Sequence, residues 1–290
     1  MKQILSLSAA ALALTFAACD NVDEKDRYIP IEFQETEKVV LAEEFTGANC
    51  PNCPTGAEVM TGFHETYGDN FIAVSMYPSQ LSTLTEPKNV DLRTEIASSI
   101  FEAYNQENTL PAVMFNRTRI DGKVMQATKP EVWGAAVYNL FNNPENKYAP
   151  CDITLSSAYD PKVNDAKDPA YRQLTVNYRA EFKHNVDQNV SFQIYILENG
   201  IVSRQAGPNG LIPRYVNNHV LRTALNGTWG QEYGGGHAAG SSIEGTSTVT
   251  LPEEWNADNI QVVGFLCNTG GDRQVLHAAM LKSIVPATEE

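Results

Sequence analysis

Residues 38–54 read Lys-Val-Val-Leu-Ala-Glu-Glu-Phe-Thr-Gly-Ala-Asn-Cys-Pro-Asn-Cys-Pro, and their pattern is the main signal for the fold of the first half of the chain. The apolar run over 38–46 predicts a strand, and the apolar spacing over 54–67 predicts a helix. Cys50 and Cys53 then lie at the helix N-terminus, where free backbone N–H groups and the helix dipole favour a thiolate. The spacing lets the second thiol attack a mixed disulfide formed on the first. The stretch therefore predicts a C-x-x-C pair capable of redox chemistry.

The residues that follow continue an alternation of strands and helices. Apolar runs predict strands over 71–77 and 112–116, and apolar residues at helical spacing predict helices over 88–106 and 131–141. Strands that alternate with helices indicate an α/β domain. We expect this domain to span residues 37–146.

The hydrophobic pattern changes to a period of two after residues 142–146, whose Asn, Pro and Glu content predicts a linker. Further strands are predicted over 174–182, 190–196, 218–225, 246–251, 260–267 and 275–284. About seven strands with few helical stretches are typical of an antiparallel sandwich. We therefore expect an all-β sandwich domain over residues 147–290.

The N-terminus has the pattern of an export signal. Lys2 supplies a positive start, residues 4–14 are mostly apolar, and two alanines precede Cys19. This predicts a signal peptide over 1–18. A cysteine directly after small residues resembles a bacterial lipobox, although Phe16 stands where that motif has leucine. The resemblance implies lipidation of Cys19, with residues 19–36 as an acidic tether to a membrane.

The composition excludes several classes of function. The 290 residues carry 21 Lys and Arg against 35 Asp and Glu, a net charge of −14. A chain this acidic lacks the basic surface that nucleic acids require. Beyond the N-terminus, no stretch approaches the roughly 18 apolar residues of a membrane helix. No nucleophile elbow and no phosphate loop is present. We expect no nucleic-acid partner, no cofactor and no bound metal.

Two further features accompany the cysteine pair. Glu44 lies six residues before Cys50, and Pro111 lies in Thr-Leu-Pro-Ala-Val directly before a predicted strand. Strand, pair, helix, acid and proline in this order resemble the thioredoxin superfamily. The resemblance implies that Cys50 attacks, that Cys53 resolves, and that a buried Glu44 of raised pKa carries the proton. It also implies that Pro111 follows a cis bond and presents substrate.

Other features leave alternatives open. The hairpin expected over 112–124, with Asp121-Gly122 at its turn, matches the same superfamily, but Asn49 replaces its usual aromatic residue. Alone, a C-x-x-C pair could also be half a zinc site. Zinc would need a second ligand pair, and His64 would lie about 16 Å along the helix from Cys53. A structural disulfide that braces an exported protein also stays open.

The second half contains two weaker candidates. Cys151 and Cys267 could pair in an oxidising compartment and close a loop of more than 100 residues. They could equally be separate buried thiols. His219, Arg222 and His237 form a speculative ligand site near a glycine-rich loop. The alternative is that local hydrogen bonds satisfy both histidines.

The whole layout resembles the Omp28-type outer membrane lipoproteins of Bacteroidota. The lipoprotein signal, the C-x-x-C half and the β-rich half carry the resemblance, together with Glu-Asn-Gly-Ile-Val at 198–202 and Asn-His-Val-Leu-Arg at 218–222. It implies an outer-membrane location, is compatible with exposure on the cell surface, and suggests an adhesin or receptor role.

Two hypotheses of different classes follow. The first is a membrane-tethered thiol–disulfide oxidoreductase that acts on envelope or surface proteins with thiols or disulfides through Cys50, Cys53, Glu44 and Pro111. The second is a surface-exposed binding protein for a host or extracellular ligand, in which the cysteine pair is a structural disulfide. An accessible Cys50 favours the first hypothesis, and a covered pair favours the second.

Overall fold

A computed structural model describes residues 37–79, 89–105, 107–127, 129–144, 147–161, 167 and 171–285. The described residues belong to one compact unit. The predicted signal peptide, Cys19 and the whole tether lie outside the described residues, so they stay predictions. None of the helices in the described ranges has the length and apolar character that crossing a membrane requires.

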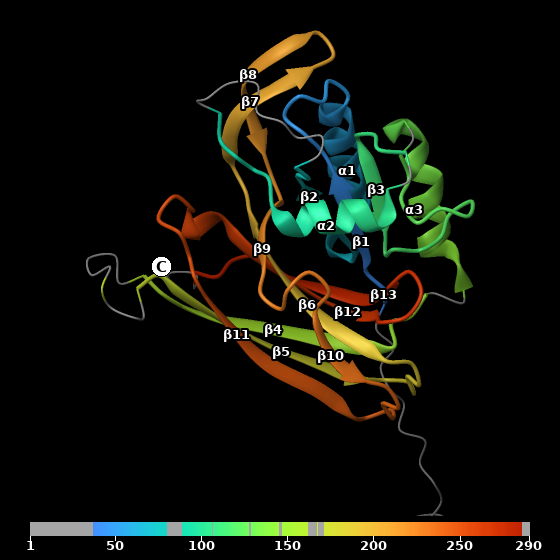
Figure 1. The fold of residues 1–290 in the computed structure, drawn as a ribbon. Helices are drawn as coiled ribbons and strands as arrows, with labels where there is room; N and C mark the ends of the chain where they lie inside the picture. The colour runs from blue at the N-terminus through green and yellow to red at the C-terminus, as the bar shows by residue number, and fades with distance from the viewer. Residues whose placement is uncertain are drawn as a thin grey trace, which may run out of the picture. The chain divides into compact units, whose positions relative to one another are not determined.

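The described residues contain three α-helices and thirteen strands (Figure 1). The helices are α1 (Cys53–Tyr67), α2 (Glu95–Tyr104) and α3 (Trp133–Asn142). The strands are β1 (Val40–Phe45), β2 (Phe71–Met76), β3 (Ala112–Phe115), β4 (Cys151–Asp160), β5 (Gln173–Phe182), β6 (Val190–Glu198), β7 (Ile201–Gly207), β8 (Gly210–Asn217), β9 (Val220–Ala224), β10 (Gln231–Gly234), β11 (Ser242–Thr250), β12 (Ile260–Asn268) and β13 (Val275–Leu281).

The expected fold class, an α/β thioredoxin-like domain followed by an all-β sandwich domain, is wrong. The chain is mostly β-structure, and strands from both halves form one mixed sheet of eight strands. Its order is β13-β12-β6-β9-β2-β1-β3, with β10 paired to β6. A sheet of β11, β5 and β4 and a hairpin of β7 and β8 complete the described strands.

The mixed sheet arises because β9 of the second half pairs with β2 of the first. The Ser75 backbone N–H donates to the His219 carbonyl at 2.8 Å, and Ser75 lies opposite Val220 in parallel register. β9 also pairs antiparallel with β6. Periodicity identifies strands and their buried faces, but an unpaired strand edge offers the same N–H and C=O groups to any neighbour. The local pattern could therefore not reveal this joint.

Different elements cover the two faces of the mixed sheet (Figure 1). α1 and α3 pack on β1, β2 and β3, where Met60 and Trp133 meet the strand side chains. α2 packs on the opposite face, through Ile100 and Phe101. The β11-β5-β4 sheet packs on β6 and β12. β6 is therefore covered on both faces, and all nine of its residues are buried.

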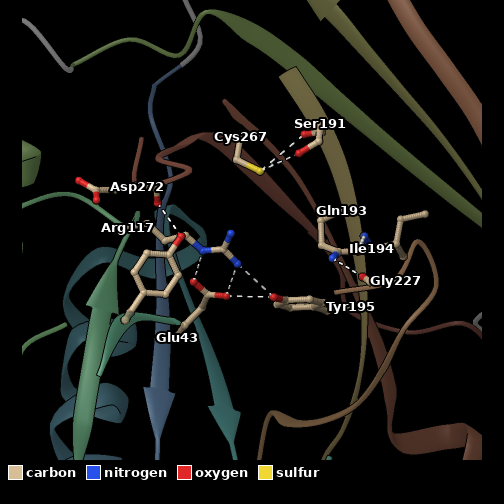
Figure 2. Close-up of polar contacts among 10 residues, drawn as sticks. Glu43, Arg117, Ser191, Gln193, Ile194, Tyr195, Gly227, Cys267 and Asp272 are labelled. Atoms are coloured by element: carbon tan, nitrogen blue, oxygen red, sulfur yellow. Dashed lines mark hydrogen bonds and ion pairs between the residues drawn. The ribbon is translucent and has the colours of Figure 1, made fainter. Parts of the chain in front are cut away.

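A buried polar cluster ties the first half of the chain to β6 (Figure 2). The Arg117 guanidinium donates from Nε and Nη2 to the two carboxylate oxygens of Glu43, both at 2.7 Å. The Tyr195 hydroxyl donates to the same carboxylate at 3.0 Å. The guanidinium also lies over the rings of Trp229 and Phe265. The Glu43 and Arg117 side chains are each 1% exposed, so the pair is a desolvated ion pair with its bonding groups engaged.

Candidate functional site

Cys50 and Cys53 form a disulfide where β1 leads into α1. Cys50 ends the turn after the strand, and Cys53 is the first residue of the helix. The two residues between them, Pro51 and Asn52, are exposed, whereas Cys50 is 8% exposed and Cys53 is 2% exposed. The disulfide thus lies just beneath the surface at the positive end of a fifteen-residue helix.

Glu44 lies buried beneath the first turn of α1. It is 2% exposed, and its Oε1 has no hydrogen-bond partner among the described residues. Burial raises the pKa of this carboxyl from 4.5 to about 8, because the charged form loses its hydration. A neutral carboxyl near pH 7 can donate a proton, and a modest rise in pH makes it a base.

Gly56 makes room for this carboxyl. A Cβ at position 56 would come within 2.4 Å of Glu44 Oε1 and 3.4 Å of Pro111 Cβ. Gly56, Glu44 and Pro111 therefore meet at one point on α1, three residues after Cys53. The Leu110–Pro111 peptide bond is cis, as the resemblance implied. The structure brings all four predicted residues together, and Gly56 is a member of the site that sequence reasoning missed.

The buried carboxyl predicts a pH-dependent stability. The unfolded chain ionises Glu44 from about pH 4.5, whereas the folded chain keeps the proton until about pH 8. Stability from this group is therefore fully present below pH 4.5 and falls as pH rises toward 8. Between pH 5 and pH 8 we expect wild type to lose on the order of 3 kcal/mol relative to Glu44→Gln. Urea unfolding of both proteins at the two pH values measures this, and parallel pH profiles would contradict it.

A cavity of about 290 Å³ lies beside the disulfide. Glu44 and Cys53 line it together with residues of α1, while Gln205 and Tyr215 from the β7–β8 hairpin line its other side. Burial, with a further contribution from Glu44, raises the pKa of Tyr215 to about 12. Sequence reasoning missed both hairpin residues, because Gln205 and Tyr215 lie more than 150 residues after Cys50 in the chain.

The two other cysteines among the described residues do not pair. Cys151 and Cys267 are free and buried, so they do not form the disulfide that was one of the two alternatives. Cys151 packs between the β11-β5-β4 sheet and the mixed sheet, whereas Cys267 faces the side that α2 covers. The Cys267 Sγ contacts the Ser191 hydroxyl at 3.2 Å (Figure 2). The two thiols therefore lie on opposite sides of the mixed sheet.

The speculative ligand residues do not converge either. His219 Nδ1 lies 3.0 Å from the Gln261 side-chain oxygen, and Arg222 contacts Glu198 and lies over the Trp255 ring. Glu198 is the last residue of β6. His237 stacks on Phe182 and pairs with Val186, which precedes the other end of β6. The nine residues of β6 span about 26 Å, so His237 and Arg222 cannot share a small ligand.

Comparison with known proteins places these features in a family context. Residues 98–283 match the model of a family described as outer membrane protein Omp28. A search of curated proteins finds no match.

Two of the solved structures that match share the fold at low sequence identity. HBP35 of Porphyromonas gingivalis matches with a TM-score of 0.63 and 15% identity, over 89% of this chain and 80% of that chain. A protein of Agrobacterium tumefaciens matches with a TM-score of 0.50 and 13% identity, over 89% of this chain and 99% of that one. A domain of the outer membrane lipoprotein Omp28 from Porphyromonas gingivalis is 21% identical, with a TM-score of 0.31, over 47% of this chain and 88% of that chain.

Proposed function

This chain belongs to the Omp28 family of outer membrane proteins, and we propose that it exchanges disulfides with envelope or surface proteins through Cys50 and Cys53. The observation that carries the proposal is the buried Glu44 carboxyl. Its Oε1 has no hydrogen-bond partner among the described residues, and it lies under the first turn of the helix that Cys53 begins. A carboxyl in this state is costly to bury, and perturbed acids of this kind concentrate at sites of proton transfer.

The proposed chemistry starts from the disulfide. A thiolate of a partner dithiol attacks Cys50 Sγ, the Cys50–Cys53 bond breaks, and the electron pair leaves on Cys53 Sγ. Glu44 gives its proton to that sulfur. The second partner thiolate attacks the mixed disulfide, and Cys50 leaves as a thiolate. Two electrons pass from the partner to the cysteine pair, and a second partner, a protein disulfide, reoxidises the pair by the reverse steps.

Pro111 and the surface beside it have a supporting role in this proposal. Pro111 lies next to Glu44 at Gly56, and the exposed Pro51 and Asn52 mark where the site reaches solvent. A partner segment that docks there would meet the rim of the disulfide first. Attachment of the protein through a lipid on Cys19, and its display on the cell surface, are further parts of the proposal.

A second candidate function is a surface binding protein in which the cysteine pair is a structural disulfide. The observation that favours it is the low exposure of Cys50, 8%, because exchange requires a partner sulfur to reach the Cys50 Sγ. In this case the ligand surface lies elsewhere on the protein.

The reduction potential of the pair separates the two candidates. Titration in glutathione or dithiothreitol buffers, followed by alkylation and mass spectrometry, measures the oxidised fraction of Cys50 and Cys53. We expect a potential above about −270 mV, in the range of proteins that exchange disulfides. A potential below about −300 mV, with slow reaction toward small thiols, would indicate a structural disulfide and support the binding protein.

A further inference from the structure

The Cys50 carbonyl lies in the cysteine turn, residues 47–53, just before the N-cap of α1. The Cys53 backbone N–H donates to this carbonyl at 3.3 Å. Residue 54 is proline and has no N–H to add a second local bond. A carbonyl oxygen has two lone pairs, so it can also accept from a donor in another part of the chain.

Gln205 of β7 supplies that donor. Its side chain is 2% exposed, and its Nε2 lies 3.0 Å from the Cys50 carbonyl oxygen and 3.0 Å from the Gly47 carbonyl oxygen. The next residue, Ala206, donates its backbone N–H to the Ala48 carbonyl at 2.7 Å. Three carbonyls of the turn before Cys53 are therefore bonded to one short segment of the hairpin.

The hairpin is itself anchored, so it can act as a fixed support. The Asn89 side chain accepts from the Arg204 backbone N–H at 2.9 Å and donates to the Arg204 carbonyl at 3.2 Å. At the end of β8, Asn217 donates to the Ile201 carbonyl and accepts from the Tyr77 hydroxyl, both at 2.7 Å. The hairpin that carries Gln205 is therefore bonded to Asn89 next to Gln205 and to Tyr77 at the end of β8.

We propose that Gln205 is a positioning residue for the Cys50–Cys53 pair, and that its hydrogen bonds to the Cys50 and Gly47 carbonyls hold the turn in the conformation that closes the disulfide. Oxidation joins the two sulfurs and releases two electrons and two protons to an oxidant, here oxidised dithiothreitol. A turn held in place raises the effective concentration of one thiol at the other, as in any intramolecular reaction. Loss of Gln205 therefore disfavours the disulfide against the dithiol.

This inference deepens the proposed function and rests on it for its biological meaning, but the redox equilibrium of the pair can be measured without any partner. Gln205→Met keeps the length of the side chain and removes its N–H donors. We expect the equilibrium constant for disulfide formation, measured on the full chain in dithiothreitol buffers, to fall about tenfold. That change raises the reduction potential by about 30 mV.

The matched control is Gln193→Met. Gln193 of β6 is also buried, with 1% exposure, and its Nε2 donates to the Gly227 carbonyl at 2.7 Å (Figure 2). It contacts no residue of the cysteine turn in the described hydrogen bonds. We expect Gln193→Met to lower the stability of the fold while the reduction potential stays at the wild-type value. A Gln205→Met potential equal to wild type would overturn the proposal and leave Gln205 a structural residue.

Hydrogen exchange on the wild-type protein gives a second test, which needs no variant to fold. If Gln205 and Ala206 support the closed turn, the Ala206 backbone N–H exchanges faster after reduction than before. Equal exchange in the two states would overturn the proposal. Failure of the proposed function is distinguishable. A wild-type potential below about −300 mV with the tenfold effect intact rejects disulfide exchange and retains the role of Gln205.

Discussion

Arg117→Met is expected to lower the free energy of unfolding by about 3–5 kcal/mol. The substitution leaves the Glu43 carboxylate 1% exposed and without its cation, and the Tyr195 hydroxyl alone cannot offset the loss of hydration. Removal of one partner of a buried ion pair costs far more than the pair itself contributes, because the remaining charge stays desolvated. Chemical denaturation at pH 7 measures the change.

Arg119→Met is the matched control, because Arg119 lies only two residues after Arg117 in the chain. Arg119 bonds Asp272 in a comparable ion pair, but its side chain is 58% exposed. Water screens that pair, so its loss should cost about 1 kcal/mol or less. Equal losses in Arg117→Met and Arg119→Met would contradict the account of the buried cluster.

The double variant Glu43→Leu with Arg117→Met refines the interpretation. It removes both charges, and we expect it to recover much of the stability that Arg117→Met loses. If the double variant is no more stable than Arg117→Met, the contacts of the guanidinium with Trp229 and Phe265 carry the stabilisation instead.

Cys50→Ser is expected to reduce insulin-disulfide reduction in dithiothreitol to the rate of the buffer alone. Exchange through a mixed disulfide needs a nucleophilic sulfur at the position nearer to solvent and a second sulfur to resolve the intermediate. A serine hydroxyl forms no disulfide. The companion variant Cys53→Ser should accumulate a mixed disulfide on Cys50, which mass spectrometry of the alkylated protein detects.

The control for thiol loss is Cys151→Ala. Cys151 is a free thiol that is fully buried in β4, away from the cysteine turn. We expect this variant to reduce insulin at the wild-type rate. If Cys50→Ser also retains the wild-type rate, the pair is a structural disulfide and the binding-protein function is favoured.

The local features of the site follow from the sequence. The apolar run over 38–46, the helical spacing after Pro54 and the spacing of the cysteines predict a strand, a pair and a helix, and the structure has β1, the disulfide and α1 in these places. These features depend on contacts within a few residues, where side-chain periodicity and the missing N–H of proline act directly. Glu44 is singled out by the resemblance instead, because it lies six residues before Cys50.

The distant segments that complete these features depend on the tertiary structure. Glu43 and Glu44 are neighbours in one apolar strand, yet Arg117 and Tyr195 bond the Glu43 carboxylate, whereas Glu44 Oε1 has no hydrogen-bond partner among the described residues. Likewise, the sequence shows that Pro54 has no N–H to offer the Cys50 carbonyl, but it does not show that Gln205 donates to that carbonyl. Hydrogen bonds between remote segments depend on which strand edges meet, and backbone edges are chemically alike in every strand. The pairing of β2 with β9 therefore determines both the fold class and the surroundings of the cysteine pair.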